Sequence, residues 1–148
     1  MKIRPTYLFI LLMLTFWSCV KYEEVKESEL PSITYEAVLP AEPQEFSDSI
    51  KIIINYKDGN GDLGSEDPDD LNIEVKDNRL DKPDFYHLQA LAPPNSNIPI
   101  EGQLTIRLKN TFLIGSGNEE VTSYEVRIRD KAGNWSNYIT TDFITIRR

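Results

Sequence analysis

Apolar and polar residues alternate along three segments of this chain, and this pattern limits its fold more than any other feature of the sequence. The segments are residues 49–57, 103–109 and 123–129. In the first, Ile50, Ile52 and Ile54 fall on one face of an extended strand and the residues between them on the other. No stretch of this part of the chain sustains the i, i+3, i+4 spacing of an amphipathic helix. The sequence therefore predicts half-buried β-strands at all three places.

Four further segments are predicted to be strands on a weaker pattern: residues 32–39, 71–76, 85–91 and 137–146. In the last, Ile144 and Ile146 fall on one face but Ile139 and Phe143 on the other, so we expect a bulge or mixed burial there. Turns rich in Gly, Pro, Asn and Asp separate the segments. Seven strands at this spacing predict an all-β fold, an antiparallel β-sandwich over residues 32–148.

The amino-terminal residues follow a different pattern. Lys2 and Arg4 precede an uncharged, almost wholly apolar run at residues 7–17. As a helix this run would rise only about 16 Å, against the roughly 30 Å hydrocarbon core of a bilayer. A positive flank, a short apolar run and the small residue Ser18 are typical of a cleaved signal peptide. Residues 1–18 are therefore left out of the predicted fold.

Cys19 follows Ser18 directly and is the one cysteine of the chain. This order resembles the lipobox of bacterial lipoproteins, although Phe16 and Trp17 are bulkier than the usual lipobox residues. The resemblance implies cleavage before Cys19 and acylation of that cysteine. The alternative is that Cys19 only ends an ordinary signal or a membrane anchor. With one thiol the exported chain forms no internal disulfide, so its fold depends on its core.

Residues 19–31 are charged and end at a proline, so we expect an acylated tether that holds the domain away from the membrane. Lys21, Glu23 and Glu24 resemble the surface-export signal of Bacteroidetes-type lipoproteins, although a solvated linker explains these charges equally well. The expected location is the cell envelope, as an outer-membrane lipoprotein on either its periplasmic or its exposed side.

The charge of the chain limits its partners. Its formal net charge is −8, and removal of Lys2 and Arg4 with the signal peptide makes the mature form more acidic still. Such a surface repels phosphate groups, which argues against nucleic-acid binding and against adsorption to anionic lipids. We expect the acyl chains on Cys19 to make the membrane contact.

Two stretches carry a further resemblance. Residues 129–148 look like the last two strands of bacterial immunoglobulin-like or fibronectin type III-like domains, and residues 55–64 resemble a loop that recurs in small Bacteroidetes-type lipoproteins with this architecture. The residues that match the first pattern are Asp130, Ala132, Gly133, Asn134 and Ser136. The resemblance implies an immunoglobulin-like sandwich. The disulfide of antibody domains is absent.

The richest group of metal-binding side chains lies in residues 58–70, which hold six carboxylates and no Lys or Arg. Asp58, Asn60 and Asp62 alternate between glycines that let the backbone curl, and oxygen ligands at this spacing suit calcium. The loop is no EF-hand, because Leu63 stands where that motif needs glycine. The alternative is a turn whose acids are simply solvated.

The predicted topology adds a fourth ligand to this hypothesis. In an immunoglobulin-like sandwich the loops after residues 49–57 and 123–129 lie at one end, which brings Asp130 and Asn134 towards Asp58 and Asp62. Converging carboxylates repel one another unless a positive charge lies between them. Calcium would supply that charge and stiffen the loops; Arg129 or Lys131 could supply it without a metal.

Other candidate residues have ordinary structural explanations beside them. Trp135 and Tyr138 could stack on a sugar or anchor a protein partner, or could simply cap the core. His87 is the one histidine and is expected to be structural, because no triad or zinc ligand set can be assembled around it. Asp48, Ser49 and Ile50 resemble an O-glycosylation acceptor of exported Bacteroidetes proteins, or Ser49 merely begins a strand.

These observations predict a lipid-anchored, non-catalytic binding or scaffolding module of the cell envelope, stabilised by calcium. It would be a subunit of an outer-membrane assembly, or a surface that binds an envelope protein or a glycan. The alternative from another class is a hydrolase or glycan-processing accessory enzyme that uses paired carboxylates.

Overall fold

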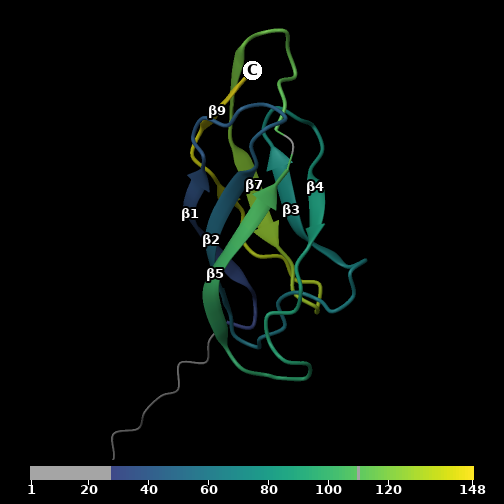
Figure 1. Ribbon diagram of the computed structural model, residues 1–148. Helices are drawn as coiled ribbons and strands as arrows, with labels where there is room; N and C mark the ends of the chain where they lie inside the picture. Colours follow the sequence, from purple (N-terminus) through teal and green to yellow (C-terminus); the bar gives the residue numbers. More distant parts are fainter. Residues whose placement is uncertain (1–27, 110) are drawn as a thin grey trace, which may run out of the picture.

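The computed structural model describes residues 28–109 and 111–148, which form two packed antiparallel β-sheets (Figure 1). One sheet has the order β1-β2-β5, the other β4-β3-β7-β8, and β6 pairs with β9 beyond them. The strands are β1 Ser32–Leu39, β2 Ile50–Asp58, β3 Leu71–Asp77, β4 Asp84–His87, β5 Ile100–Leu108, β6 Glu119–Thr122, β7 Tyr124–Ile128, β8 Ile139–Thr140 and β9 Ile144–Arg147. These residues include no α-helix. The all-β, antiparallel prediction is confirmed.

The alternating residues form the core between the two sheets. Ile50, Ile52 and Ile54 of β2 are fully buried and lie opposite Leu108, Ile106 and Leu104 of the neighbouring strand β5. In the other sheet, Val126 and Ile128 of β7 are equally buried and lie opposite Val75 and Ile73 of β3. Each residue of this kind contributes roughly 1.5–3 kcal/mol by leaving water. The two-residue period therefore decides which face of every central strand turns inward.

The described residues form nine strands rather than the seven predicted, because the predicted strand 137–146 is split into β8 and β9, and β6 was not predicted. β6, which the sequence did not predict, precedes β7 and is separated from it by Ser123, whose carbonyl accepts a hydrogen bond from Asn78 N. At the same level β8 and β9 are separated around Thr141, whose hydroxyl accepts a hydrogen bond from Tyr124 N. Phe143 turns outward in this break while Ile144 is buried, so the mixed burial expected of residues 137–146 is confirmed.

The predicted signal peptide, residues 1–18, and the acylated Cys19 lie outside the described residues. So do Lys21, Glu23 and Glu24, and most of the predicted tether. Among the residues that the structure describes, no helix is long and apolar enough to cross a bilayer.

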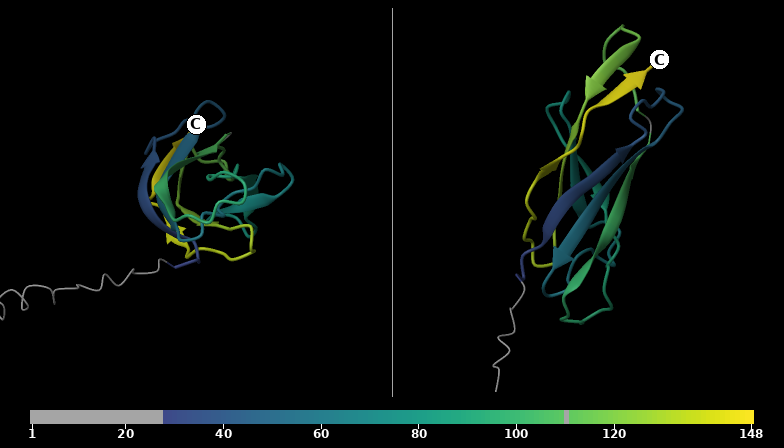
Figure 2. Two further views of the ribbon diagram at one scale, coloured as in Figure 1. Left: turned by 90° about the horizontal axis from the view of Figure 1, so that it is seen from below. Right: turned by 90° about the vertical axis from the view of Figure 1, so that its left-hand side faces the viewer.

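The two ends of the sandwich differ in what they carry. The chain enters β1 at the end formed by the loops after β2, before β5 and after β7, which we call the tether end (Figures 1 and 2). The opposite end, here the far end, carries the β3–β4 turn, residues 40–49, residues 111–118 and the carboxyl terminus.

A buried ion pair organises the far end. Arg79 binds Asp77 through two nitrogens, at 2.7 and 3.1 Å, and reaches Glu120 of β6 at 2.6 Å. Thr122 Oγ1 donates a further hydrogen bond to Asp77. Burial by itself raises the pKa of Asp77, but the hydrogen bonds from Arg79 and Thr122 outweigh it, so the pKa lies below its usual range. Asp77 is therefore held as a carboxylate.

Replacement of Asp77 by asparagine should cost about 2 kcal/mol at pH 7, because it removes a charge-assisted pair of hydrogen bonds and leaves the partly buried Arg79 with Glu120 as its carboxylate partner. A carboxyl whose pKa is lowered by folding stabilises the fold above its unfolded pKa, and this contribution is lost as the pH falls through the folded pKa. The difference between wild type and Asp77→Asn should therefore shrink below about pH 4. Urea unfolding at pH 7, 4 and 2.5 measures it.

The matched control is Asp81→Asn, which removes an exposed carboxylate from the same turn and should change stability by less than about 0.5 kcal/mol. Equal losses in both variants, or a loss that does not depend on pH, would contradict the role given to Asp77.

Candidate functional site

Two buried carboxylates meet at the tether end of the core. Asp58 continues the inward-facing row of Ile50, Ile52 and Ile54 on β2 and is 1% exposed. Asp130 continues the inward-facing row of β7 in the other sheet and is 3% exposed. Because both rows run between the sheets, the period that buries the isoleucines also buries these acids. The sequence contained this signal, although it was not used in the prediction.

The loop after β2 turns back at once and contacts the loop after β7. Asp62 N donates a hydrogen bond to Asp58 Oδ2 at 2.9 Å, which closes a five-residue turn. Lys131 N then donates to the carbonyl oxygen of Asp62 at 3.1 Å, and Leu63 pairs with Asp130 in an isolated β-bridge. The structure thus brings together the two loops that the predicted topology placed at one end. We call Asp58, Asn60, Asp62 and Asp130 the candidate cation site.

Three oxygens of this site are buried without a hydrogen-bond partner in the protein: Asp58 Oδ1, Asn60 Oδ1 and Asp62 Oδ1. They belong to the alternating residues that the sequence analysis selected as ligands. An unsatisfied buried acceptor costs about 1–3 kcal/mol, and more when it is charged. Asp130 differs, because Asn134 donates to both of its carboxylate oxygens, at 2.7 and 2.9 Å.

The pKa values of the acids at this site also indicate that their negative charge is not balanced. Burial, followed by repulsion from Asp62 and Asp130, raises the pKa of Asp58. Burial and repulsion from Asp130 raise the pKa of Asp62, and Lys131 offsets this in part. The described residues form no ion pair with Asp58, Asp62 or Asp130. Two other nearby cations engage other acids: Arg129 pairs with Asp70 at 2.7 Å and Lys57 with Glu101 at 2.8 Å.

The carboxylates alone do not complete a metal site. Within the described part of the chain, no group of three or more His, Cys, Asp or Glu side chains is arranged to hold an ion. A cation at this place would also need the amide oxygen of Asn60, together with backbone carbonyls and water. A mixed oxygen set of this kind is one that a hard cation accepts and that zinc, with its nitrogen and sulfur ligands, does not favour.

Trp135 and Tyr138 lie beside the cation site and stack on arginines. The guanidinium of Arg127 is 4.2 Å from the centre of the Trp135 ring and 4.5 Å from that of Tyr138. Arg127 also pairs with Glu74 at 2.6 Å, and Glu74 accepts the Tyr138 hydroxyl at 2.9 Å. These contacts give both rings a structural role on the outer face of β3 and β7. Whether they also bind a ligand stays a prediction.

The remaining sequence candidates have local partners. His87 Nδ1 lies 3.1 Å from the carbonyl oxygen of Asp70, in keeping with a structural histidine. Ser49 is half-buried directly before β2, and its neighbour Asp48 accepts a hydrogen bond from Gln44 N at 2.8 Å.

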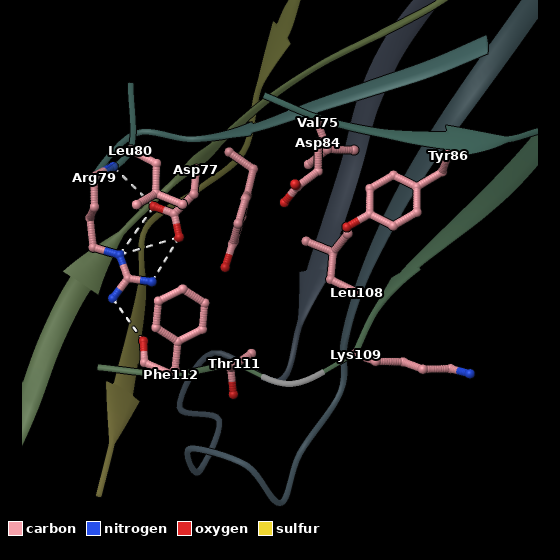
Figure 3. A pocket seen from close by; sticks show the side chains of 11 residues that line it. Val75, Asp77, Arg79, Leu80, Asp84, Tyr86, Leu108, Lys109, Thr111 and Phe112 are labelled. Carbon is pink, nitrogen blue, oxygen red and sulfur yellow. Dashed lines mark hydrogen bonds and ion pairs between the residues drawn. The ribbon is translucent and has the colours of Figure 1, made fainter. Parts of the chain in front are cut away.

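A small cavity of about 70 Å³ opens near the far end, and Figure 3 shows its lining. Two carboxylates, Asp77 and Asp84, border this cavity. Asp77 is engaged there by Arg79, as the dashed lines show. A carboxylate held in its charged form is unsuited to the role of a general acid.

Comparison with known proteins adds no relative to this description: neither a protein-family model, nor a curated protein, nor a solved structure matches the chain.

Replacement of Gly61 by alanine should destabilise the protein more than replacement of Gly133. Both glycines have positive φ, 72° and 91°, which costs an alanine about 1 kcal/mol. A Cβ on Gly61 would also lie 2.4 Å from the carbonyl oxygen of Ile98, whereas nothing lies within 4 Å of one on Gly133. We expect a loss of about 1 kcal/mol for Gly133→Ala and at least twice that for Gly61→Ala, measured by urea unfolding. Equal losses would mean that the loop relaxes freely.

Proposed function

We propose that this protein is a lipid-anchored, non-catalytic binding module of the bacterial cell envelope, acting as a subunit or scaffold of an outer-membrane assembly. The proposal combines the signal peptide and Cys19 of the sequence with a domain that has a distinct anchored end and free end. The strand order β1-β2-β5 facing β4-β3-β7-β8 supports its immunoglobulin-like part.

The observation that carries the proposal is a set of exposed large apolar side chains at the end opposite to the tether, five of the eleven such side chains among the described residues. The side chains concerned are Leu39, Phe46, Phe112, Ile114 and Val121, which are 39–74% exposed. Phe46 is the most exposed of them at 74%, and it has φ of 57°, a conformation that a bulky residue rarely adopts. An anchored protein meets its partners with the end that points away from the membrane, and exposed aromatic side chains are typical anchors of protein interfaces.

Local contacts place two of these side chains, Phe46 and Phe112, in neighbouring segments. Phe46 N donates to the carbonyl oxygen of Thr111 at 2.8 Å, and Leu113 N donates to Glu45 Oε2, so residues 44–46 lie against residues 111–113. Paired charges surround them: Arg148 with Glu45, and Arg147 with Glu42 and Glu119. An apolar centre with a polar rim favours a protein partner over a glycan.

The hydrolase alternative receives less support. Its best carboxylate pair, Asp77 and Asp84, lines a cavity of about 70 Å³, which is small beside the 300–1,000 Å³ of typical ligand sites. Asp77 is also occupied by Arg79 and Thr122.

The anchor is tested by metabolic labelling with a palmitate analogue. Because the chain has a single cysteine, the wild-type protein should take up label and Cys19→Ser should take up none. The wild-type mature chain should also begin at residue 19 by mass spectrometry. Label that persists in Cys19→Ser, or a wild-type protein without label, would exclude acylation at Cys19.

The free-end surface is tested with two matched phenylalanines. Phe46 and Phe143 are 74% and 75% exposed, and Phe143 lies between β8 and β9, next to Asp142, which accepts a hydrogen bond from Tyr35 in the middle of β1. In crosslinking on intact cells, Phe46→Ser should lose most of the crosslinked envelope partner, whereas Phe143→Ser should keep it. Loss in both variants, or in neither, would contradict a partner site at the far end.

A further inference from the structure

We propose that one calcium ion binds between the loop after β2 and the loop after β7, and so joins the two sheets at the tether end. Its side-chain ligands are the three residues with unpartnered oxygens, Asp58, Asn60 and Asp62, and Asp130 of the other sheet adds negative charge beside them. This inference does not depend on the lipid anchor or on the binding surface at the far end.

The first support is the set of unpartnered oxygens. Asp58 is 1% exposed, yet its Oδ1 has no hydrogen-bond partner, and the side-chain oxygens of Asn60 and Asp62 are in the same position. Acids at the surface of an ordinary turn would point into water instead. Here all three oxygens turn inward while Asp62 N keeps the turn closed on Asp58 Oδ2. A group that binds oxygens only, and carries positive charge, satisfies all three at once.

The second support is that the charge of the site comes from two sheets. Asp58 ends β2 and Asp130 follows β7, so no local rearrangement within one loop separates them. Asp130 already uses both carboxylate oxygens as acceptors for Asn134, but each oxygen has a second lone pair available. An ion between the loops would replace mutual repulsion by attraction.

The donor chemistry favours calcium over magnesium. Calcium accepts six to eight oxygens in irregular arrangements, including amide and backbone carbonyl oxygens, whereas magnesium requires a near-ideal octahedron and usually keeps several waters. The loop after β2, shaped by Gly61 with φ of 72°, offers two carboxylates and one amide, and Asp130 adds negative charge from the other sheet. An irregular, protein-rich oxygen set of this kind suits the larger ion.

A cavity beside the candidate cation site gives an ion a path to it, and the same place contacts the beginning of the described chain. A cavity of about 180 Å³ opens beside Asp58 and Gly59, and its other wall is the beginning of the described chain, from Ser28 to Ser32. Gly59 N donates to the carbonyl oxygen of Ser28 at 3.0 Å. An ion that fixes residues 58–62 therefore also fixes the point at which the tether meets the domain.

The test is thermal unfolding of the full chain, purified in detergent, in EDTA, in calcium chloride and in magnesium chloride. Calcium at a hundredfold excess over its dissociation constant adds about 2.7 kcal/mol, which should raise the melting temperature by roughly 10 °C. Asp58→Asn removes one charge but keeps an oxygen that can accept from Asp62 N. The matched control is Glu66→Gln, which removes one exposed carboxylate from the same acidic segment.

The proposal predicts that the order of melting temperatures differs between calcium and EDTA. In calcium, the melting temperature of wild type and of Glu66→Gln should rise, and that of Asp58→Asn should rise much less. In EDTA, Asp58→Asn should melt at or above the temperature of wild type, because the repulsion between carboxylates is relieved. Asp62→Asn provides the same comparison if Asp58→Asn does not fold, and calorimetric titration should give one ion per chain. No calcium shift in wild type, equal shifts in all variants, or an equal shift in magnesium would overturn the assignment.

Discussion

Two inward-facing rows of alternate residues, one on β2 and one on β7, hold this protein together. Ile50, Ile52 and Ile54 in one sheet, and Val126 and Ile128 in the other, are completely buried and make the two sheets one body. Both rows run on past the apolar residues to a carboxylate, Asp58 in the first and Asp130 in the second. Side chains alternate strictly between the two faces of a strand unless a bulge intervenes. The alternation that turns the isoleucines and valines into the core therefore also turns Asp58 and Asp130 inward, at one end of the core.

The acids at the two ends of the sandwich differ in whether a positively charged side chain pairs with them. At the far end Asp77 is matched by Arg79, and the pair joins β3 to β6 through Glu120. At the tether end Asp58 and Asp62 have no such partner among the described residues, and their pKa values are raised accordingly, first by burial. A buried ion pair and a metal ion solve the same electrostatic problem. At the far end the counter-charge is Arg79, a residue of the protein itself. At the tether end, we propose that calcium supplies the counter-charge.

Much of the fold could be predicted from local sequence patterns. The differences between the predicted and the observed strands have a common cause. The seven predicted segments all contain observed strands, since alternation survives wherever one face is buried. The sequence did not predict β6, because Glu119 and Glu120 leave it no apolar row, and it forms only by pairing with β9. The breaks at Ser123 and Thr141 face each other, because β6 pairs with β9 and β7 with β8, and the register between the two segments shifts at this point. A shift of register is set by residues distant in the chain.

The sequence by itself determined the strand faces, the acidic turn with its alternating oxygens, and the single cysteine after an apolar run. These features are local, since each depends on the order of neighbouring residues. Only the tertiary structure decided that Asp77 is paired and that Asp58, Asn60 and Asp62 are left with unsatisfied oxygens. It also decided that Trp135 and Tyr138 stack on Arg127. The two-residue period already places Asp58 and Asp130 on the inward faces of their strands. Which partner each buried group finds depends on what the two sheets bring together across the core, and no local pattern records that.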